Sequence, residues 1–499
     1  MIHGTVSENA LYKAFQHQVD SRPDAAALLL DSTSNTAREC SWRALSVVVD
    51  QIADRIVTVF STTTTVRCIT HASDNSDADI VIALASMKLG MTEAPLDCRM
   101  ESSELLRRRN YIGGIWIDDH FKRQIATELV EAADSSSTDG SNHRKLSHPA
   151  NNCHRGKLPP RSEKASLILW TSGTTSEPLA VQLSAESLHA NAAAKLKAVP
   201  QQQSDLRLTM LPISHAYART CDFGTWLLSG CTLAMCLGYQ SMLRRLKELR
   251  PHLINTVPAV ASRMLQSPPA NLVNLRLLGC GGAPLDTVSF MKWNERGVTV
   301  IQGYGLTEAG PVISSATPFD AMPGLVGEPV EGWEVAIKQG QLFVRGQHSM
   351  LGYLRQQDAT NHRMTDDGWL ATGDLVERDR KTRQLRILGR VDDVIILPSG
   401  RKIYPASIER DIEQIEGIQH ALLHYKAELQ LWLDLAADAD EAVVTNEALQ
   451  VLSRQAATLK CTVHFFQPAL SIEAGELTAK ETIRRGRIIQ ERLSDHAGS

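Results

Sequence analysis

Residues 165–181 read Ala-Ser-Leu-Ile-Leu-Trp-Thr-Ser-Gly-Thr-Thr-Ser-Glu-Pro-Leu-Ala-Val. The apolar run from Leu167 to Trp170 predicts a buried strand, and it leads directly into hydroxyl residues around one glycine. Hydroxyls donate to phosphate oxygens, and Gly173 lets backbone N–H groups approach a ligand closely. The stretch is therefore typical of a phosphate-holding loop after a strand, although a Ser/Thr-rich surface turn has the same composition. It lacks the Gly-x-x-x-x-Gly-Lys spacing of a Walker A loop.

The composition describes a large globular protein without a strong charge bias. The chain has 499 residues, 43% of them hydrophobic, which is too long for one ordinary core and predicts two or more domains. Its formal net charge of −4 argues against nucleic acid as a partner. The 9 cysteines follow no zinc or disulfide spacing, so we expect reduced thiols in the cytoplasm. We expect neither a secretory signal nor a transmembrane segment, because no apolar run is long enough.

Strands and helices alternate along the first part of the chain. Residues 42–59 and 78–89 have helical apolar periodicity, and an apolar run over 66–70 predicts a strand between them. Gly90 stands where the second helix would end. This alternation predicts an α/β fold built of layers. Residues 131–164 are rich in polar and charged residues with almost no apolar anchor, which predicts a flexible insertion.

Two further loops follow predicted strands in the second part of the chain. A strand over 298–302 leads into Gly303-Tyr-Gly-Leu-Thr-Glu308, and one over 275–278 leads into the Gly281-Gly-Ala283 loop. Ligands in open α/β sheets collect at the carboxyl ends of strands. A carboxylate there can hold Mg²⁺ against phosphates. Backbone with few side chains can lie against a planar base or an acyl chain, although a tight strand–helix turn has the same sequence.

Taken in order, these motifs resemble those of the adenylate-forming enzymes, which include acyl-CoA synthetases, luciferases and peptide-synthetase adenylation domains. The resemblance covers about residues 10–490. It implies a large α/β N-terminal AMP-binding domain of several subdomains over 1–388 and a hinge at 389–393 around Asp392. A small, mobile α+β domain over 394–499 would follow. Rotation about such a hinge would separate two half-reactions.

The resemblance also implies a role for each matching residue. Binding of ATP falls to Thr171, Ser172, Gly173, Thr174, Thr175, Gly281, Gly282, Ala283, Tyr304, Asp374, Arg390 and Lys402. Catalysis falls to His215, Thr307, Glu308 and Lys480. Among these, Glu308 would hold Mg²⁺, Asp374 would bind both ribose hydroxyls, and His215 would lie beside the acyl pocket.

Two motifs depart from the pattern of the resembling enzymes. Their phosphate loop usually reads Thr-Ser-Gly-Thr-Thr-Gly-x-Pro-Lys-Gly-Val, but Ser176, Leu179 and Ala180 replace its last two glycines and its lysine. Their C-terminal motif, Thr-x-x-Gly-Lys-x-x-Arg, aligns so that Thr482 stands at the catalytic lysine, and Lys480 lies slightly earlier. Threonine carries no charge and cannot repeat the role of that lysine. We expect Lys480 to take it over, unless the chain is a degenerate member that binds nucleotide or acyl-CoA without catalysis.

The implied reaction has two steps and uses small-molecule partners. A carboxylate attacks the α-phosphate of ATP, giving an acyl-adenylate and pyrophosphate, and the thiol of CoA then displaces AMP. The expected cofactors are therefore ATP, Mg²⁺ and CoA. The stretch from Ser214 to Tyr217 favours a fatty or other apolar acid. An aryl acid of the o-succinylbenzoate type, and transfer of the acyl group to a carrier protein, are the alternatives.

Overall fold

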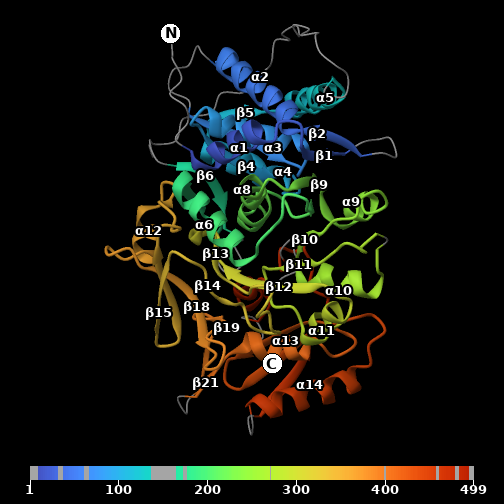
Figure 1. Ribbon diagram of the computed structural model, residues 1–499. Helices are drawn as coiled ribbons and strands as arrows, with labels where there is room; N and C mark the ends of the chain where they lie inside the picture. Colours follow the sequence, from blue (N-terminus) through green and yellow to red (C-terminus); the bar gives the residue numbers. More distant parts are fainter. Residues whose placement is uncertain are drawn as a thin grey trace.

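The computed structural model describes residues 9–31, 37–60, 67–135, 165–171, 177–269, 271–397, 401–456, 460–477 and 483–493. Helices and strands alternate through it, and they form the α/β protein that the sequence predicts (Figure 1). The first helix, α1 (Ala10–Ser21), begins where the Asn9 side chain accepts hydrogen bonds from the N–H groups of Leu11 and Tyr12.

The central sheet has nine strands, in the order β14-β13-β12-β11-β10-β8-β9-β1-β2. Its parallel middle consists of β12 (Thr299–Gly305), β11 (Leu277–Cys280), β10 (Leu253–Thr256), β8 (Leu206–Thr209), β9 (Thr232–Met235) and β1 (Ala26–Leu30). Antiparallel strands form its edges: β13 (Val312–Ser315), β14 (Glu328–Pro329) and β2 (Arg38–Ser41). The middle strands are short and buried, as parallel strands between helices are. Their carboxyl ends point to one edge, which carries the predicted ligand loops.

A second sheet of six strands, ordered β17-β7-β6-β4-β3-β5, carries the predicted phosphate loop. Its strands are β3 (Cys68–Ser73), β4 (Thr92–Asp97), β5 (Ile115–Ile117), β6 (Ala165–Trp170), β7 (Ala180–Ser184) and β17 (Gly352–Tyr353). The predicted buried strand at the start of the loop is confirmed as β6. It pairs with β7 in an antiparallel hairpin, and β17 comes from far along the chain to extend that hairpin.

The two sheets share one apolar core, in which the rings of Trp42 and Trp226 stack at 5.0 Å. The predicted helices over 42–59 and 78–89 are confirmed as α2 (Trp42–Phe60) and α3 (Asp77–Lys88). Further elements are α4 (Ser102–Ile112), α5 (Asp119–Ser135), α6 (Ala185–Ala198), α7 (Ala216–Ala218), η1 (Arg219–Gly224), α8 (Thr225–Ser229), α9 (Gly238–Arg245), α10 (Pro258–Gln266), α11 (Thr287–Glu295), η2 (Thr307–Ala309) and α12 (Gln357–Arg363). Of the helices in the described ranges, none is long and apolar enough to cross a membrane.

Helix α5 corrects one boundary of the predicted insertion. It continues to Ser135, so residues 131–135 are helical rather than part of a flexible segment. Val130 and Ala133 pack on the shared core, and this packing extends the helix past the change in composition. The rest of the predicted insertion, residues 136–164, lies outside the described residues.

A four-stranded antiparallel sheet and a small α+β unit complete the fold. The sheet comprises β15 (Trp333–Lys338), β16 (Gln341–Gly346), β18 (Leu370–Arg378) and β19 (Leu385–Arg390). The unit comprises β20 (Ile395–Ile396), β21 (Lys402–Ile403), α13 (Pro405–Ile412), β22 (Ile418–Tyr425), β23 (Leu429–Leu435), α14 (Glu441–Ala456), β24 (Cys461–Phe465), α15 (Arg485–Ile488) and η3 (Ile489–Leu493). It has its own apolar core around Ile412 and Leu431, and it lies at one end of the molecule, where α13 contacts β19 (Figure 1).

Candidate active site

The predicted phosphate loop leaves β6 and returns at β7. At its base, the Thr171 N–H donates to the Leu179 carbonyl oxygen at 3.0 Å, and the Leu179 N–H donates to Thr171 Oγ1 at 2.9 Å. The Thr171 hydroxyl therefore closes the base of the loop. Because the contact uses the backbone of residue 179, it does not depend on the lysine that leucine replaces. The other predicted loop residues, Ser172, Gly173, Thr174 and Thr175, lie outside the described residues.

Three predicted nucleotide-binding residues meet beside the end of β12. The Tyr304 hydroxyl donates to Asp374 Oδ2 on β18. Arg390 on β19 donates from Nη1 to Asp374 Oδ1 at 3.1 Å and to the Thr372 carbonyl oxygen at 3.1 Å. Asp374 and Arg390 are cross-strand partners, so antiparallel pairing fixes their contact. The fold thus brings together residues from three separate motifs.

The Asp374 carboxyl is buried, and its environment suits a ligand with paired hydroxyls. Burial raises its pKa against the opposing effects of Arg390 and the Tyr304 hydroxyl. Burial also raises the pKa of Tyr304 well above its usual value, so this hydroxyl keeps its proton and donates it. Both carboxylate oxygens have donors here, and the hydroxyls of a sugar can take the place of such donors.

Glu308 lies in the short turn η2 after β12, next to Thr307, and is 6% exposed. Its Oε1 accepts a 2.7 Å hydrogen bond from the Tyr353 hydroxyl, and its carbonyl oxygen accepts from the Met350 N–H at 2.8 Å. Burial and the nearby Glu308 charge raise the pKa of Tyr353. Tyr353 is therefore a donor at neutral pH, and it is a positioning partner that the sequence motif does not predict.

His215 lies between β8 and α7, where the two large sheets meet. Its Nε2 is 3.0 Å from Asp97 Oδ2, at the end of β4. The same carboxylate accepts from Arg99 Nη2 at 2.6 Å and from Arg99 Nε at 2.9 Å. Burial alone would raise the pKa of Asp97, but hydrogen bonds from Arg99 and His215 hold it well below its usual range. Asp97 stays ionised and fixes the partly exposed ring of His215.

The Gly281-Gly-Ala283 loop follows β11 and packs against an aromatic ring. A Cβ atom on Gly281 would lie 3.1 Å from the Tyr217 ring, and one on Gly279 would lie 1.8 Å from Asn255 Oδ1. Position 279 therefore requires glycine, and a side chain at 281 would press on the ring. Gly282, at φ +85°, and Ala283 are exposed. The sequence predicts that a planar group or an acyl chain can lie close to this backbone, and in the structure the ring of Tyr217 lies close to it at Gly281.

The remaining predicted residues belong to the hinge and the C-terminal unit. Asp392 is exposed, and its Oδ2 lies 3.8 Å from Arg390 Nη2. Lys402 is exposed on β21. Lys480 and Thr482, which decide whether a catalytic lysine is present, lie outside the described residues.

The end of the C-terminal motif is tied to the small unit and to the hinge region. Arg485 binds Glu409 of α13 through Nη2 and lies 3.6 Å from Asp393 through Nε. Burial lowers the pKa of Arg485, but the Glu409 charge raises it. The second effect is stronger, so the pKa of Arg485 lies above its usual value. This arginine therefore links the last motif to the residue next to the predicted hinge position.

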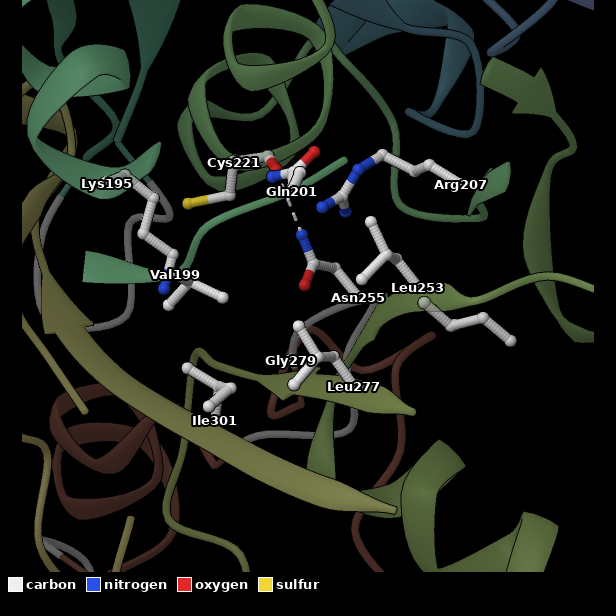
Figure 2. Close-up of a pocket in the computed structure, with 11 residues that line it drawn as sticks. Lys195, Val199, Gln201, Arg207, Cys221, Leu253, Asn255, Leu277, Gly279 and Ile301 are labelled. Carbon is white, nitrogen blue, oxygen red and sulfur yellow. Dashed lines mark hydrogen bonds between the residues drawn. The ribbon is translucent and has the colours of Figure 1, made fainter. Parts of the chain in front are cut away.

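A pocket that no sequence motif predicts lies on the face of the central sheet covered by α6 and η1 (Figure 2). It is lined by Lys195, Val199, Gln201, Arg207, Cys221, Leu253, Ile254, Asn255, Leu277, Gly279 and Ile301. Side chains of a strand alternate between its faces, so Leu253 and Asn255 of β10 and Leu277 and Gly279 of β11 lie on the same face of the sheet. Gly279 lies between the side chains of Asn255 and Tyr217, and a Cβ atom there would lie 1.8 Å from Asn255 Oδ1 and 2.9 Å from the Tyr217 hydroxyl. The turn η1 is π-helical, a conformation found often at functional sites.

This chain belongs to the family described as AMP-binding enzyme, which matches residues 15–354. A feruloyl-CoA synthase from Amycolatopsis sp is 28% identical over 284 residues, 52% of this chain and 56% of that protein. A long-chain-fatty-acid–CoA ligase from Yersinia pestis is 31% identical over 275 residues, 49% of this chain and 47% of that protein. A 2-succinylbenzoate–CoA ligase from Bacillus pumilus is 28% identical over 260 residues, 49% of this chain and 53% of that protein. The chain spans about half the length of the curated relatives it matches.

Solved structures share the fold over nearly the whole chain. ATP-bound MatB from Rhodopseudomonas palustris has a TM-score of 0.75 at 21% identity, covering 97% of this chain and 99% of that chain. O-succinylbenzoate CoA synthetase from Bacillus subtilis, with ATP and magnesium, has a TM-score of 0.75 at 18% identity, covering 95% of this chain and 98% of that chain. These likenesses confirm the predicted α/β fold class with its smaller second unit.

Proposed function

We propose that this protein is an AMP-forming acid–thiol ligase, which uses ATP to join a carboxylic acid to CoA. The observation that carries the proposal is the meeting of Tyr304, Asp374 and Arg390 beside β12, the strand that also delivers Glu308. A buried carboxylate held by two donors suits a sugar, and a second buried carboxylate after the same strand suits the attached phosphates through a metal ion. Membership of the AMP-binding enzyme family supports the same reaction class.

The side chains of this site fit ATP and Mg²⁺. Asp374 offers two carboxylate oxygens to the ribose hydroxyls, and Arg390 offers a planar cation to the phosphates. Within the described ranges, no three His, Cys, Asp or Glu side chains form a metal cluster. Mg²⁺ is commonly held by one or two carboxylates and by substrate phosphates, so the single carboxylate of Glu308 fits it. When bound, the ion supplies positive charge at the phosphates.

The residues of the chain bind and orient the reactants for two displacements. In the first, an oxygen of the acid forms a bond to the α-phosphorus and the bond to pyrophosphate breaks. In the second, the CoA sulfur, having lost its proton, bonds to the acyl carbon, and AMP leaves. We assign Thr307 and the 171–175 loop to the phosphates and His215, oriented by Asp97, to the acyl side. Positioning and charge neutralisation are the main contributions a protein makes to such chemistry.

We propose a mobile C-terminal domain over 394–499, joined by a hinge at 389–393 to an N-terminal domain over 1–388. The small unit has a separate apolar core, which lets it move as one body. Asp392 has an exposed side chain, so a change of its backbone angles would disturb little packing. We assign Lys480 and the exposed Lys402 to the nucleotide. Leu179 and Thr482 stand where the motifs of the resembling enzymes have lysines.

Two classes of acid compete as substrate. The Ser214–Tyr217 sequence favours a fatty or other apolar acid. The pocket has an apolar side, made by Val199, Leu253, Leu277 and Ile301. On its other side, Asn255 and the Arg207–Asp222 ion pair occupy the space between sheet and η1. Covering these polar groups with a long alkyl chain would be costly, so the pocket supports a compact acid, such as an aryl acid.

The proposed partners are a small carboxylic acid, ATP and CoA, with an acyl carrier protein as the alternative acceptor. The 8 cysteines of the described ranges are all free. Reduced thiols suit the cytoplasm, which we propose as the location.

The experiment that tests the function measures AMP and pyrophosphate release from ATP over a panel of carboxylic acids, with and without CoA. The proposal expects pyrophosphate with acid alone, and AMP with a thioester once CoA is added. A thioester formed on an acyl carrier protein but not on CoA would show that the acceptor of the acyl group is the carrier protein. ATP binding without pyrophosphate release from any acid would favour a degenerate binding protein.

A further inference from the structure

We propose that Glu93 and Arg219 are positioning residues for His215, the side chain assigned to the acyl side of the active site. Their buried ion pair and the contact between Asp97 and His215 hold one helical turn against β4 at both of its ends. The inference rests on the proposed ligase function, because it concerns the residue that this function places beside the acid.

The helical turn begins at His215 and ends at Arg219. The Arg219 N–H donates to the His215 carbonyl oxygen at 3.0 Å, which closes the turn. Residues four positions apart lie on the same side of a helix, so both side chains can reach the same neighbour. That neighbour is β4. His215 Nε2 lies 3.0 Å from Asp97 Oδ2, and Arg219 Nη1 donates to Glu93 Oε1 at 3.2 Å.

Strand β4 presents the two carboxylates on one face. Glu93 and Asp97 are four positions apart in the strand, and side chains at even separations along a strand share a face. The six-stranded sheet therefore holds the turn at two points. Loss of the Glu93 contact would leave the turn, and with it the His215 ring, attached to β4 through Asp97 alone.

The ion pair of Glu93 and Arg219 has two points of contact and lies in the interior. The two side chains are 1% and 2% exposed, and Arg219 Nη2 binds the second carboxylate oxygen, Oε2. The guanidinium also lies 4.6 Å from the centre of the Phe223 ring. A planar guanidinium with two bonds to one carboxylate has a fixed orientation. The pair is therefore suited to fixing the backbone of the turn.

A buried histidine also holds Glu93. His71 Nε2 of β3 lies 3.2 Å from Glu93 Oε1, and its Nδ1 lies 3.4 Å from Asp79 Oδ1 of α3. Burial lowers the pKa of His71, but the hydrogen bonds and charges of Asp79 and Glu93 raise it more, so its pKa lies above the usual value. The raised pKa favours the protonated ring, which has a donor for each carboxylate.

Lys122 of α5 completes this network of alternating charges. Its Nζ lies 2.7 Å from Asp79 Oδ1, binds Asp74 and donates to the Ala72 carbonyl oxygen at 2.9 Å. Replacement of a buried ion pair by apolar residues often leaves a protein equally stable or more stable. Stability therefore does not account for these buried charges, whereas a role in fixing the turn that carries His215 does.

The test measures how strongly the His215 ring is held in the intact protein. Diethyl pyrocarbonate acylates the ring nitrogens of histidine, and peptide mass spectrometry gives the rate at each ring. The His215 side chain is 34% exposed, so the reagent reaches it. Asp97→Asn removes the carboxylate beside Nε2 and sets the rate for a released ring. The exposed His362 of α12 is the internal reference.

Three variants separate positioning from stability. Arg219→Met breaks the contact with Glu93, and Arg219→Lys keeps the charge without the two-point geometry. Lys122→Met is the matched control, because Lys122 is a buried cation of the same network, but it bonds to α3 and to residues 72–74, outside the turn. Pyrophosphate release is measured with cinnamic acid and decanoic acid, one aryl and one alkyl acid, together with the KM for ATP.

We expect Arg219→Met to accelerate the acylation of His215 about 10-fold and to raise the KM for the acid by a similar factor, as for the loss of one hydrogen bond to a charged group. The KM for ATP should not change, because the residues assigned to the nucleotide keep their contacts. Arg219→Lys should recover part of both effects. Lys122→Met should match the wild-type protein in both, even if it melts at a lower temperature.

Acylation of His215 at the wild-type rate in Arg219→Met would overturn the proposal. Equal acceleration in Lys122→Met would also overturn it, since the network would then only stabilise the fold. If Arg219→Met does not fold, Glu93→Gln decides, because the amide keeps the shape of the side chain and removes its charge. Faster acylation of His215 in Glu93→Gln would support the proposal, and a wild-type rate would overturn it.

The acylation rate separates this proposal from the ligase function. If no acid releases pyrophosphate from the wild-type protein, the ligase function fails, and faster acylation in Arg219→Met would still support the positioning of His215. If an acid is active and its KM does not respond to Arg219→Met although acylation does, the link to the acid is wrong and the proposal is overturned.

Discussion

The Tyr353 hydroxyl donates a 2.7 Å hydrogen bond to Glu308 Oε1, and this contact joins the two large sheets of the protein. Tyr353 belongs to β17 of the six-stranded sheet, whereas Glu308 follows β12 of the nine-stranded sheet. The carboxylate that we propose for Mg²⁺ is therefore oriented by a residue 45 positions away in sequence.

We expect Tyr353→Phe to weaken the use of ATP and Mg²⁺ while the fold persists. A hydrogen bond to a charged group contributes ~1.5–3 kcal/mol, so kcat/KM for ATP should fall about 10- to 100-fold. Glu308→Gln removes the charge itself and should abolish pyrophosphate release. The assay is pyrophosphate release over a range of Mg²⁺ concentrations, with melting temperature as the control for folding. Wild-type kinetics for either variant would contradict the role of Glu308.

Asp374→Ala tests the proposed ribose contact. The variant removes the only carboxylate that Tyr304 and Arg390 share in the described site, so ATP affinity should fall about 10- to 100-fold. Calorimetric titration with ATP measures the change. Asp358→Ala, at an exposed position on α12, is the control and should bind ATP as the wild-type protein does. Unaltered affinity for Asp374→Ala would exclude the ribose role.

Asp97→Asn tests the electrostatics of the His215 contact. Arg99 and His215 keep the native pKa of Asp97 below its ordinary value. A carboxylate of this kind adds stability above its unfolded pKa of about 4, and the added stability is lost as the pH falls toward the native pKa. The melting temperature of the wild-type protein should therefore fall more steeply below about pH 4 than that of Asp97→Asn. Parallel curves in acid would show that the carboxylate is not stabilised in the folded state.

Local sequence patterns locate the ends of strands, but they do not indicate contacts across the fold. Residues 304–308 follow an apolar run, and β12 delivers them as that pattern predicts. Their partners lie far away in sequence. Asp374, the partner of Tyr304, is 70 positions away, and Tyr353, the partner of Glu308, is 45 positions away. Periodicity says nothing about which strands lie side by side, so neither contact could be found from it. Lys195 of α6 is buried, and its amine donates to Ser315 Oγ of β13, a contact 120 positions away in sequence that helical periodicity does not indicate.

The hinge prediction concerns Asp392, whose side chain is exposed between two separately packed units. A few residues must absorb the backbone rotation if the C-terminal domain moves between the two half-reactions. Asp392→Pro restricts φ at this position and should slow thioester formation more than adenylation. Asp392→Ala, which keeps backbone freedom, is the control. Equal loss in both steps, or none in either, would make this stretch a rigid linker.

The last prediction concerns the lysine that Thr482 replaces. Charge builds up during attack on the α-phosphate, and in the resembling enzymes a lysine at this position neutralises it. Threonine is too short and uncharged to do so. The four-carbon stem of Lys480 tolerates a small displacement along the chain, and we expect it to supply the charge. Loss of one well-placed charge in such a site typically costs ~10²–10³ in rate.

Comparison of Lys480→Ala with Thr482→Lys decides between the possible sources of this charge. If Lys480 supplies it, Lys480→Ala should lower the rate of pyrophosphate release by ~10²–10³, and Thr482→Lys should add little. If Lys480→Ala leaves the rate unchanged and Thr482→Lys raises it, the protein lacks the catalytic lysine. That result would support a degenerate member that binds nucleotide without catalysis. If neither change matters in a fully active enzyme, another cation carries the charge, and Lys402, exposed on β21 of the same unit, is the first to replace with alanine.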